Sequence, residues 1–397
     1  MVARSRLCDD EPENYDRATA CITQLVDGFG KEFSQAKVVV GQIGQMLFST
    51  NWSPCRYAFG VGLTKGSDDL MATWGEIVAT LRASGATNYD CSVMVGFIDQ
   101  AGRINQGTDR QILDECLNDP LLRPAIRILH PSHDFCEADL DLCLLALDHN
   151  DVGAWTSGDL LWRKEFSNLP SGKLMELALR LLETPNGDDV VLDALGMKLH
   201  DTDMAIDILG PEIRRLGLSA AIKRLGRESN GNTDSTDHHM ARVVKASLPR
   251  DGNDDLKAEW LDAIFSFVDA RYGHGPDFDE AIQMTAASIP EAFLDRVFGG
   301  DEEQKEKRLF FLERGAYRCL ILGKADFDRV INWCRASDDP TVWESVATAV
   351  RVFDTVGDGK SVTLSDDCVR LLEACPTPDI VLNSIGFRIA SDARPRS

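Results

Sequence analysis

Apolar residues recur at helical spacing along most of the chain, whereas strictly alternating patterns are scarce. The clearest stripe follows i, i+3, i+4, i+7 and i+8 and consists of Leu174, Leu177, Ala178, Leu181 and Leu182. A Thr-Pro-Asn-Gly break at 184–187 ends this stripe, and a second one begins at Asp188 and runs to His200. Residues 171–200 are therefore predicted to form a helical hairpin.

A turn motif recurs in the C-terminal part of the chain, where Ala-Ser is followed within a few residues by Pro. The Ala residues of its four copies are Ala246, Ala287, Ala336 and Ala390. An Ile stands five residues before each of the last three copies, and Asp-Phe-Asp occurs at both 277–279 and 326–328. Asp favours a helix N-cap and Pro favours the first helical position. Irregular intervals of roughly 40 to 55 residues are typical of arrays of helical hairpins.

These patterns predict an all-α fold, an irregular helical-hairpin array of the α-solenoid kind. We expect a disordered tail at 1–13, an N-terminal helical array at 14–228 and a C-terminal helical-repeat array at 240–397. The polar, Gly-containing segment 229–239 is predicted to be a loop or linker. One continuous array and two sub-arrays both remain open.

Two segments of the N-terminal third could alternatively form short strands. β-Branched residues cluster at 37–40 and at 90–95, but the flanks of both segments fit helices equally well. We therefore expect this third to be helical. Further along, a helix is predicted to begin at Pro340, and its apolar stripe extends to Phe353.

The charge is strongly acidic, with a formal net value of −22 over 397 residues. Because such a chain repels a phosphate backbone, nucleic acid is a disfavoured partner, and a partner protein is expected instead. The segment 128–162 contains neither Lys nor Arg. It carries the acidic residues predicted to contact a basic partner surface: Asp134, Glu137, Asp139, Asp141, Asp148, Asp151 and Asp159.

A cluster of basic residues is the second candidate partner surface. It consists of Arg214, Arg215, Lys223, Arg224 and Arg227. The simpler alternative for the basic group is pairing with acidic neighbours inside the chain. The simpler alternative for the acidic segment is a solvated face that keeps the protein soluble.

Eleven Cys residues without a Cys-x-x-Cys pair indicate free thiols in a reducing compartment. The first 14 residues lack the apolar stretch of a secretory signal, and no apolar run approaches the ~18 residues of a membrane span. We therefore expect a cytoplasmic protein without membrane contact.

The segment 130–136 contains the strongest candidate for a metal site in the sequence. His130, His133 and Cys136 could supply three of the about four donors that zinc requires. A turn with incidental His and Cys is the commoner origin of such a string. The Gly-rich segments at 60–67 and 359–361 lack the spacing of a phosphate-binding loop. The sequence thus indicates no cofactor and no catalytic residue, with a metal site as the alternative.

The turn placement and period, mainly over 241–397, resemble HEAT and armadillo arrays. The chain also resembles the helical sensor or scaffold regions of bacterial STAND-type defence proteins. This resemblance implies a surface for protein recognition, since stacked hairpins build extended concave faces. We therefore expect a non-catalytic scaffold or sensor module that belongs to a longer chain or a complex. The alternative is a metal-binding protein or enzyme that uses His130, His133 and Cys136.

Overall fold

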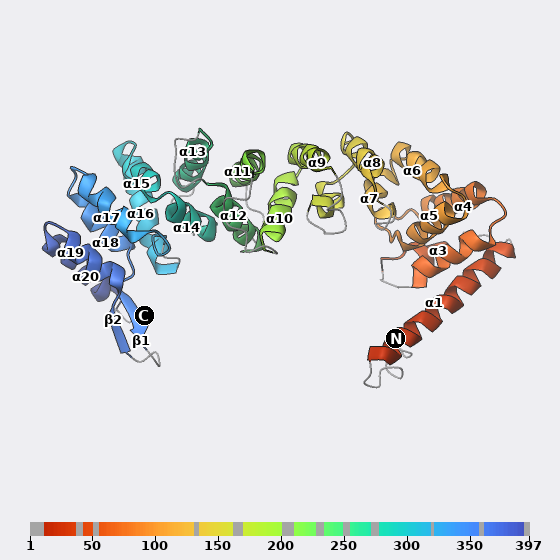
Figure 1. Cartoon of the computed structure of the whole chain (residues 1–397), viewed down its shortest axis with the longest axis horizontal. Coiled ribbons are helices and arrows are strands. Elements are labelled where there is room, and N and C mark those ends of the chain that lie inside the picture. The colour runs from red at the N-terminus through yellow and green to blue at the C-terminus, as the bar shows by residue number, and fades with distance from the viewer. Residues whose placement is uncertain are drawn as a thin grey trace. The chain divides into compact units, whose positions relative to one another are not determined.

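The computed structural model describes residues 12–36, 43–50, 55–130, 135–161, 170–200, 210–227, 234–248, 255–270, 278–318, 321–356 and 361–392. Within these ranges the chain is almost entirely helical, and its two strands form one small sheet. The predicted all-α class is therefore confirmed. Contacts divide the chain into two compact units, residues 1–180 and 181–397, whose helices are labelled in Figure 1.

The elements of the N-terminal unit are all helices within the described residues. Its elements are α1 (Pro12–Gln35), α2 (Gly44–Phe48), α3 (Cys55–Gly66), α4 (Leu70–Ser84), α5 (Ser92–Ile104), α6 (Thr108–Asn118), the 3-10 helix Arg123–Ala125, α7 (Ile126–Leu129), α8 (Glu137–Leu147), the 3-10 helices Ala154–Thr156 and Gly158–Leu161, and α9 (Ser171–Glu183), which crosses the division. The segment 90–95 thus leads into α5 and forms no strand, whereas 37–40 lies outside the described residues.

Helices of this unit pack mainly on the second helix along the chain, as in α1 on α3, α3 on α5 and α6 on α8. The closest approaches are made at glycines. A Cβ atom on Gly60 would lie 2.0 Å from the carbonyl oxygen of Val93, and one on Gly62 would lie 2.1 Å from that of Asp27. The Gly-rich segment at 60–66 is therefore part of α3 and allows its backbone to approach those of α5 and α1.

The C-terminal unit contains α10 (Gly187–His200), α11 (Pro211–Leu225), α12 (Asp234–Ser247), α13 (Asp255–Ala270), α14 (Asp279–Ser288), α15 (Pro290–Phe298), α16 (Glu302–Arg318), α17 (Phe327–Ala336), α18 (Thr341–Ala349), β1 (Phe353–Val356), β2 (Ser361–Leu364), α19 (Asp366–Ala374) and α20 (Pro378–Asp392). The two helices predicted within 171–200 are present as α9 and α10.

In this unit too, helices pack mainly on the second helix along the chain, an arrangement called next-but-one packing below. In Figure 1, α10, α12 and α14 form one row and α11 and α13 another, and contacts run along both rows. The core lies between the rows. Trp260 of α13 is fully buried, and its indole Nε1 donates a hydrogen bond to Oγ1 of Thr285 in α14 at 3.0 Å. A buried polar pair of this kind fixes the orientation of the two helices because neither group has access to water.

The Ala-Ser turn motif coincides with helix ends in three of its copies. The helix α12 ends at Ser247, α14 ends at Ser288 before a new start at Pro290, and α17 ends at Ala336. The fourth copy differs, because Ala390 lies inside α20, which continues to Asp392. The shared apolar positions of the motif are buried in all three copies that carry them: Ile282 in α14, Ile331 in α17 and Ile385 in α20.

Two boundary predictions need correction. Residues 234–239 of the predicted linker are helical, as the first turns of α12, and the division between compact units falls at 180/181 instead. The polar composition of this segment suggested a loop, but its side chains serve helix contacts. Asp237 accepts hydrogen bonds from the backbone N–H groups of Glu280 and Ala281 at 3.0 and 3.1 Å and so caps α14. Of the predicted tail, residues 1–11 lie outside the described residues, and α1 begins at Pro12.

The helix predicted from Pro340 is shorter than expected. It ends at Ala349, and Phe353 begins strand β1, which pairs with β2 in antiparallel register, Phe353 opposite Leu364. The β-branched residues between 350 and 356 favour extended backbone, and the directly opposed apolar pair stabilises the hairpin. Phe353, the last residue of the predicted helical stripe, therefore lies in a strand.

Candidate functional site

The predicted metal loop is only partly described, since His133 and Asp134 lie outside the described residues. His130 is buried, its ring packs edge-on against Phe135 at 5.0 Å, and its Nε2 lies 3.1 Å from Oδ1 of Asp139. Cys136 is exposed and forms the N-cap of α8. Among the described residues, no group of three His, Cys, Asp or Glu side chains is arranged to hold a metal ion.

Asp139 is the centre of a buried polar cluster that joins three helices. Its carboxylate accepts a hydrogen bond from the backbone N–H of Cys136 at 2.8 Å and pairs with Arg110 of α6 and with His130. Burial opposes ionisation of this carboxyl, but the hydrogen bonds from His130 and Cys136 outweigh it and hold its pKa well below the usual range. The cluster therefore fixes α6, α7 and α8 to one another.

The predicted acidic partner surface is largely engaged within the chain. Beside Asp139, four of its carboxylates form ion pairs with basic residues of neighbouring elements: Asp141 with Lys173, Asp148 with Arg180, Asp151 with Arg123, and Asp159 with Arg127. Glu137 is exposed. Contact of these residues with a partner stays a prediction, but most of their charge is already neutralised locally.

The predicted basic surface shows the same behaviour. Nε of Arg224 lies 2.8 Å from Oδ1 of Asp189, and Nη2 of Arg227 lies 2.9 Å from Oδ2 of Asp188. Burial raises the pKa of the Asp188 carboxyl above its ordinary value, although Arg227 opposes the shift. Lys223 donates a hydrogen bond to the carbonyl of Leu182. These pairs fasten the end of α11 to the start of α10.

Arg214 and Arg215 complete the basic group. Arg214 is half-buried and Arg215 is exposed on α11. A role in partner binding stays a prediction for both. Neither lines the groove described next.

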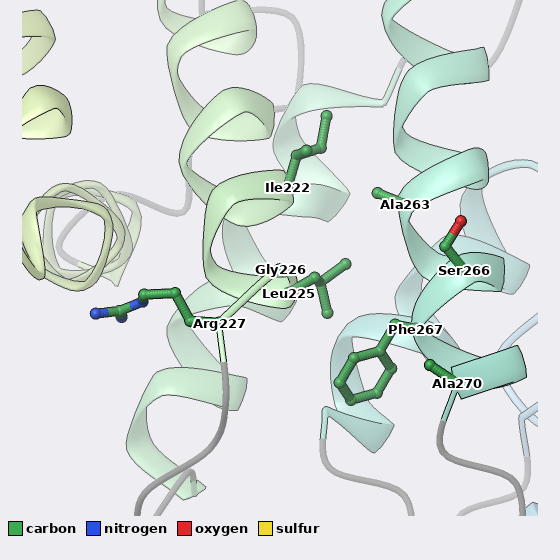
Figure 2. A pocket seen from close by; sticks show the side chains of 8 residues that line it. All are labelled: Ile222, Leu225, Gly226, Arg227, Ala263, Ser266, Phe267 and Ala270. Carbon is green, nitrogen blue, oxygen red and sulfur yellow. The ribbon is translucent and has the colours of Figure 1, made fainter.

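A groove of about 420 Å³ lies between α11 and α13. Ile222 and Leu225 of α11 face the small residues Ala263 and Ser266 of α13, while the Phe267 ring closes one end (Figure 2). The Arg227 side chain belongs to its rim, but its guanidinium points away from the gap (Figure 2) and pairs with Asp188 and Asp189 of α10. Apart from Ser266 and the rim residue Arg227, the lining side chains are apolar, so the groove can accept an aliphatic or aromatic side chain.

The sequence analysis did not identify this groove. Its walls come from two separate segments of the chain, 222–227 and 263–270, and their residues look like ordinary helix positions in the sequence. The available signal was the run of small residues at 263, 266 and 270, which lie on one face of α13. That pattern becomes informative only once α11 is known to lie opposite.

Four of the buried thiols are in surroundings that suppress their reactivity. Burial raises the pKa values of Cys91, Cys116, Cys143 and Cys334 to about 12. At about pH 8 these four thiols are expected to be alkylated at least a hundredfold more slowly in the folded protein than exposed Cys21, since only the thiolate reacts. Peptide mass spectrometry after timed iodoacetamide treatment measures this, and denatured protein supplies the control. Equal native rates would contradict the buried placement.

Comparison with known proteins adds no family: no family model, curated protein or solved structure matches the chain. No helix among the described residues is both long and apolar enough to cross a membrane. The class that the fold and the groove define is thus an all-α helical array with an apolar groove between two of its helices.

Proposed function

We propose that this chain is a non-catalytic helical-repeat module that binds another protein. The observation that carries the proposal is the next-but-one packing of the helices, which places α11 and α13 side by side. Side-by-side helices leave the grooves between them open along one edge of the array. The resemblance to HEAT and armadillo arrays is part of this proposal.

The groove between α11 and α13 is where we place the partner. Five of the seven residues of the acidic surface are paired within the chain, and so are Arg224 and Arg227. Truncating such pairs would disturb the fold before it disturbed binding. An apolar side chain of the partner instead buries surface without breaking an internal contact.

Filling the groove tests the proposal. Ser266 is exposed in the groove wall, so Ser266→Trp is expected to weaken binding of the native partner at least tenfold, about 1.4 kcal/mol, by occupying its place. Ala258→Trp is the matched control, because Ala258 is also exposed on α13 and does not line the groove.

The measurement has two stages. A stoichiometric partner is first identified by purifying the tagged chain from its native cells, and its affinity for both variants is then measured by calorimetry. Loss of binding by both variants alike, or by neither, contradicts the groove as the contact. A chain that purifies without any stoichiometric protein contradicts the function itself.

We further propose that the assembly is a bacterial defence or signalling complex of the STAND kind. The resemblance of the helical array to the sensor regions of those proteins supports this part. The genes that flank the coding sequence test it: a neighbouring nucleoside-triphosphatase gene is expected, and flanking genes of unrelated metabolism would contradict it.

A further inference from the structure

A buried phenylalanine at the start of α14 has a backbone conformation that such residues rarely adopt. Phe278 has a φ of 67° and a ψ of 35°, in the left-handed region, and its side chain is 2% exposed. A bulky side chain is crowded against its own backbone in that region, so the conformation persists only where surrounding contacts hold it. Among the described residues, the other non-glycine residue with positive φ is Asn186, and Asn tolerates this region better.

Phe278 occupies the N-cap position of α14 without acting as its cap. This position favours Ser, Thr, Asp or Asn, whose side chains accept hydrogen bonds from the first backbone N–H groups of a helix. Phe278 accepts none, and the carboxylate of Asp237 in α12 accepts from the N–H groups of Glu280 and Ala281 instead. Because another helix supplies the cap, the side chain at position 278 can serve packing.

The ring of Phe278 contacts two other helices. Its centroid lies 5.6 Å from that of Phe267 in α13, and the two rings meet edge-to-face at 62°. The guanidinium carbon of Arg224 in α11 lies over the same ring, 5.1 Å from its centroid. Arg224 is in turn held by Asp189 of α10, with Nε 2.8 Å from Oδ1. The left-handed backbone thus places one ring against α11 and α13, the two helices that form the groove.

Phe267 connects Phe278 to the groove. Its ring closes one end of the gap between α11 and α13 (Figure 2), whereas Phe278 does not line the gap. The contact with the fully buried ring of Phe278 restricts Phe267, because protein interiors are closely packed and a ring that tilts away leaves a cavity behind it. The position of Phe278 therefore bears on the length of the groove.

We propose that Phe278 is a positioning residue, which fixes the Phe267 ring as the end wall of the groove and so limits the length of the apolar side chain that the groove admits. This inference rests on the proposed function, since it concerns which partner side chain fits the same groove. It also makes a demand that partner binding alone does not make, namely a left-handed backbone at Phe278 in contact with Phe267.

Two substitutions at Phe278 test the backbone conformation. Glycine adopts positive φ without strain, so Phe278→Gly is expected to unfold at a higher urea concentration than Phe278→Ala. Phe293 is the matched control, because it is 1% exposed, packs against Phe265 at 5.3 Å and lies within α15. At Phe293 the order should be reversed, since glycine is the poorer helix former. A lower urea midpoint for Phe278→Gly than for Phe278→Ala overturns the proposal.

A thiol introduced by Ser266→Cys measures the length of the groove, because Ser266 is exposed in the groove wall. The full chain is equilibrated with diethyl and diphenethyl disulfide. The thiolate attacks either disulfide, forms a mixed disulfide and releases one probe thiol. Peptide mass spectrometry gives the ratio of phenethyl to ethyl adduct at this position. Adding Phe278→Leu is expected to raise the ratio at least about fivefold, because Phe267 tilts into the space of the lost ring. Adding Phe293→Leu should leave it unchanged.

The outcomes separate the end wall from partner binding. An unchanged ratio with Phe278→Leu, or an equal rise with Phe293→Leu, overturns the proposal. Where Phe278→Leu does not fold, Phe278→Gly in the same Ser266→Cys background gives the same test. No partner protein enters these measurements, so the end wall can be confirmed even if the chain purifies without a stoichiometric partner, which would contradict the proposed function alone.

Discussion

Replacing Arg308 by methionine is expected to destabilise the C-terminal unit by about 1.5–3 kcal/mol, because it leaves the half-buried carboxylate of Asp269 and two carbonyl oxygens without their donor. The guanidinium donates to both oxygens of Asp269, at 3.0 and 2.7 Å, and to the carbonyl oxygens of Arg296 and Gly299 at 2.8 and 3.1 Å. It also lies over the ring of Phe265. One side chain thus holds α13, α15 and α16 together. Urea unfolding followed by circular dichroism measures the loss.

The neighbouring residue provides the control for this substitution. Lys307 pairs with Glu303 within α16 at 2.7 Å, and Glu303 is 77% exposed. Lys307→Met is therefore expected to leave the urea midpoint nearly unchanged, because solvent screens an exposed pair of this kind. Adding Asp269→Leu to Arg308→Met should restore part of the loss, since it removes the stranded charge. Equal effects of the two single substitutions would show that Arg308 does not have the structural role assigned to it.

Substitution of Gly60 by alanine is expected to destabilise the N-terminal unit by more than about 3 kcal/mol, although alanine is the better helix former. The added Cβ atom would lie 2.0 Å from the carbonyl oxygen of Val93 and 2.9 Å from the backbone nitrogen of Phe97. Both are backbone atoms of α5, so no side chain can rotate away and the helices must separate. Thermal unfolding measured by calorimetry detects the effect.

The same substitution at Gly75 should have the opposite sign. Gly75 lies in α4, is exposed, and has no atom within 4 Å of the position of an added Cβ. Gly75→Ala is therefore expected to stabilise the protein by about 0.5–1 kcal/mol through lower backbone entropy of the unfolded chain. If Gly60→Ala also stabilised the protein, this result would contradict the close approach of α3 to α5 at Gly60.

Much of the secondary structure could be predicted from the sequence, because apolar spacing reports the face that each helix buries. The two helices α9 and α10 follow directly from the stripe at 174–182 and the break at 184–187. The β-hairpin was missed, since a run of Val, Thr and Phe fits a helical stripe and a strand equally well until its partner is known. Asp237 shows a second limit, because a polar side chain that caps a different helix looks like part of a loop.

The candidate sites were harder to predict because their contacts join distant segments. Arg227 and Asp189 are 38 residues apart, and Arg308 and Asp269 are 39 apart. Composition reveals an excess of acidic residues, but not which of them already have a basic neighbour. The sequence therefore predicted an acidic surface available to a partner. The residues of the groove between α11 and α13 have the same pattern as core residues, so the sequence did not distinguish them.

The limited sequence distance between contacting helices also has a consequence for how the chain acquires its structure. Among the inter-helix hydrogen bonds described above, the most distant partners are Asp237 and Ala281, 44 residues apart. Each helix therefore finds its neighbour soon after both have left the ribosome, before the rest of the chain is made. Short loops close quickly, and folding can start at several places and spread. A nascent chain of this kind acquires its core progressively, from the N-terminus onward.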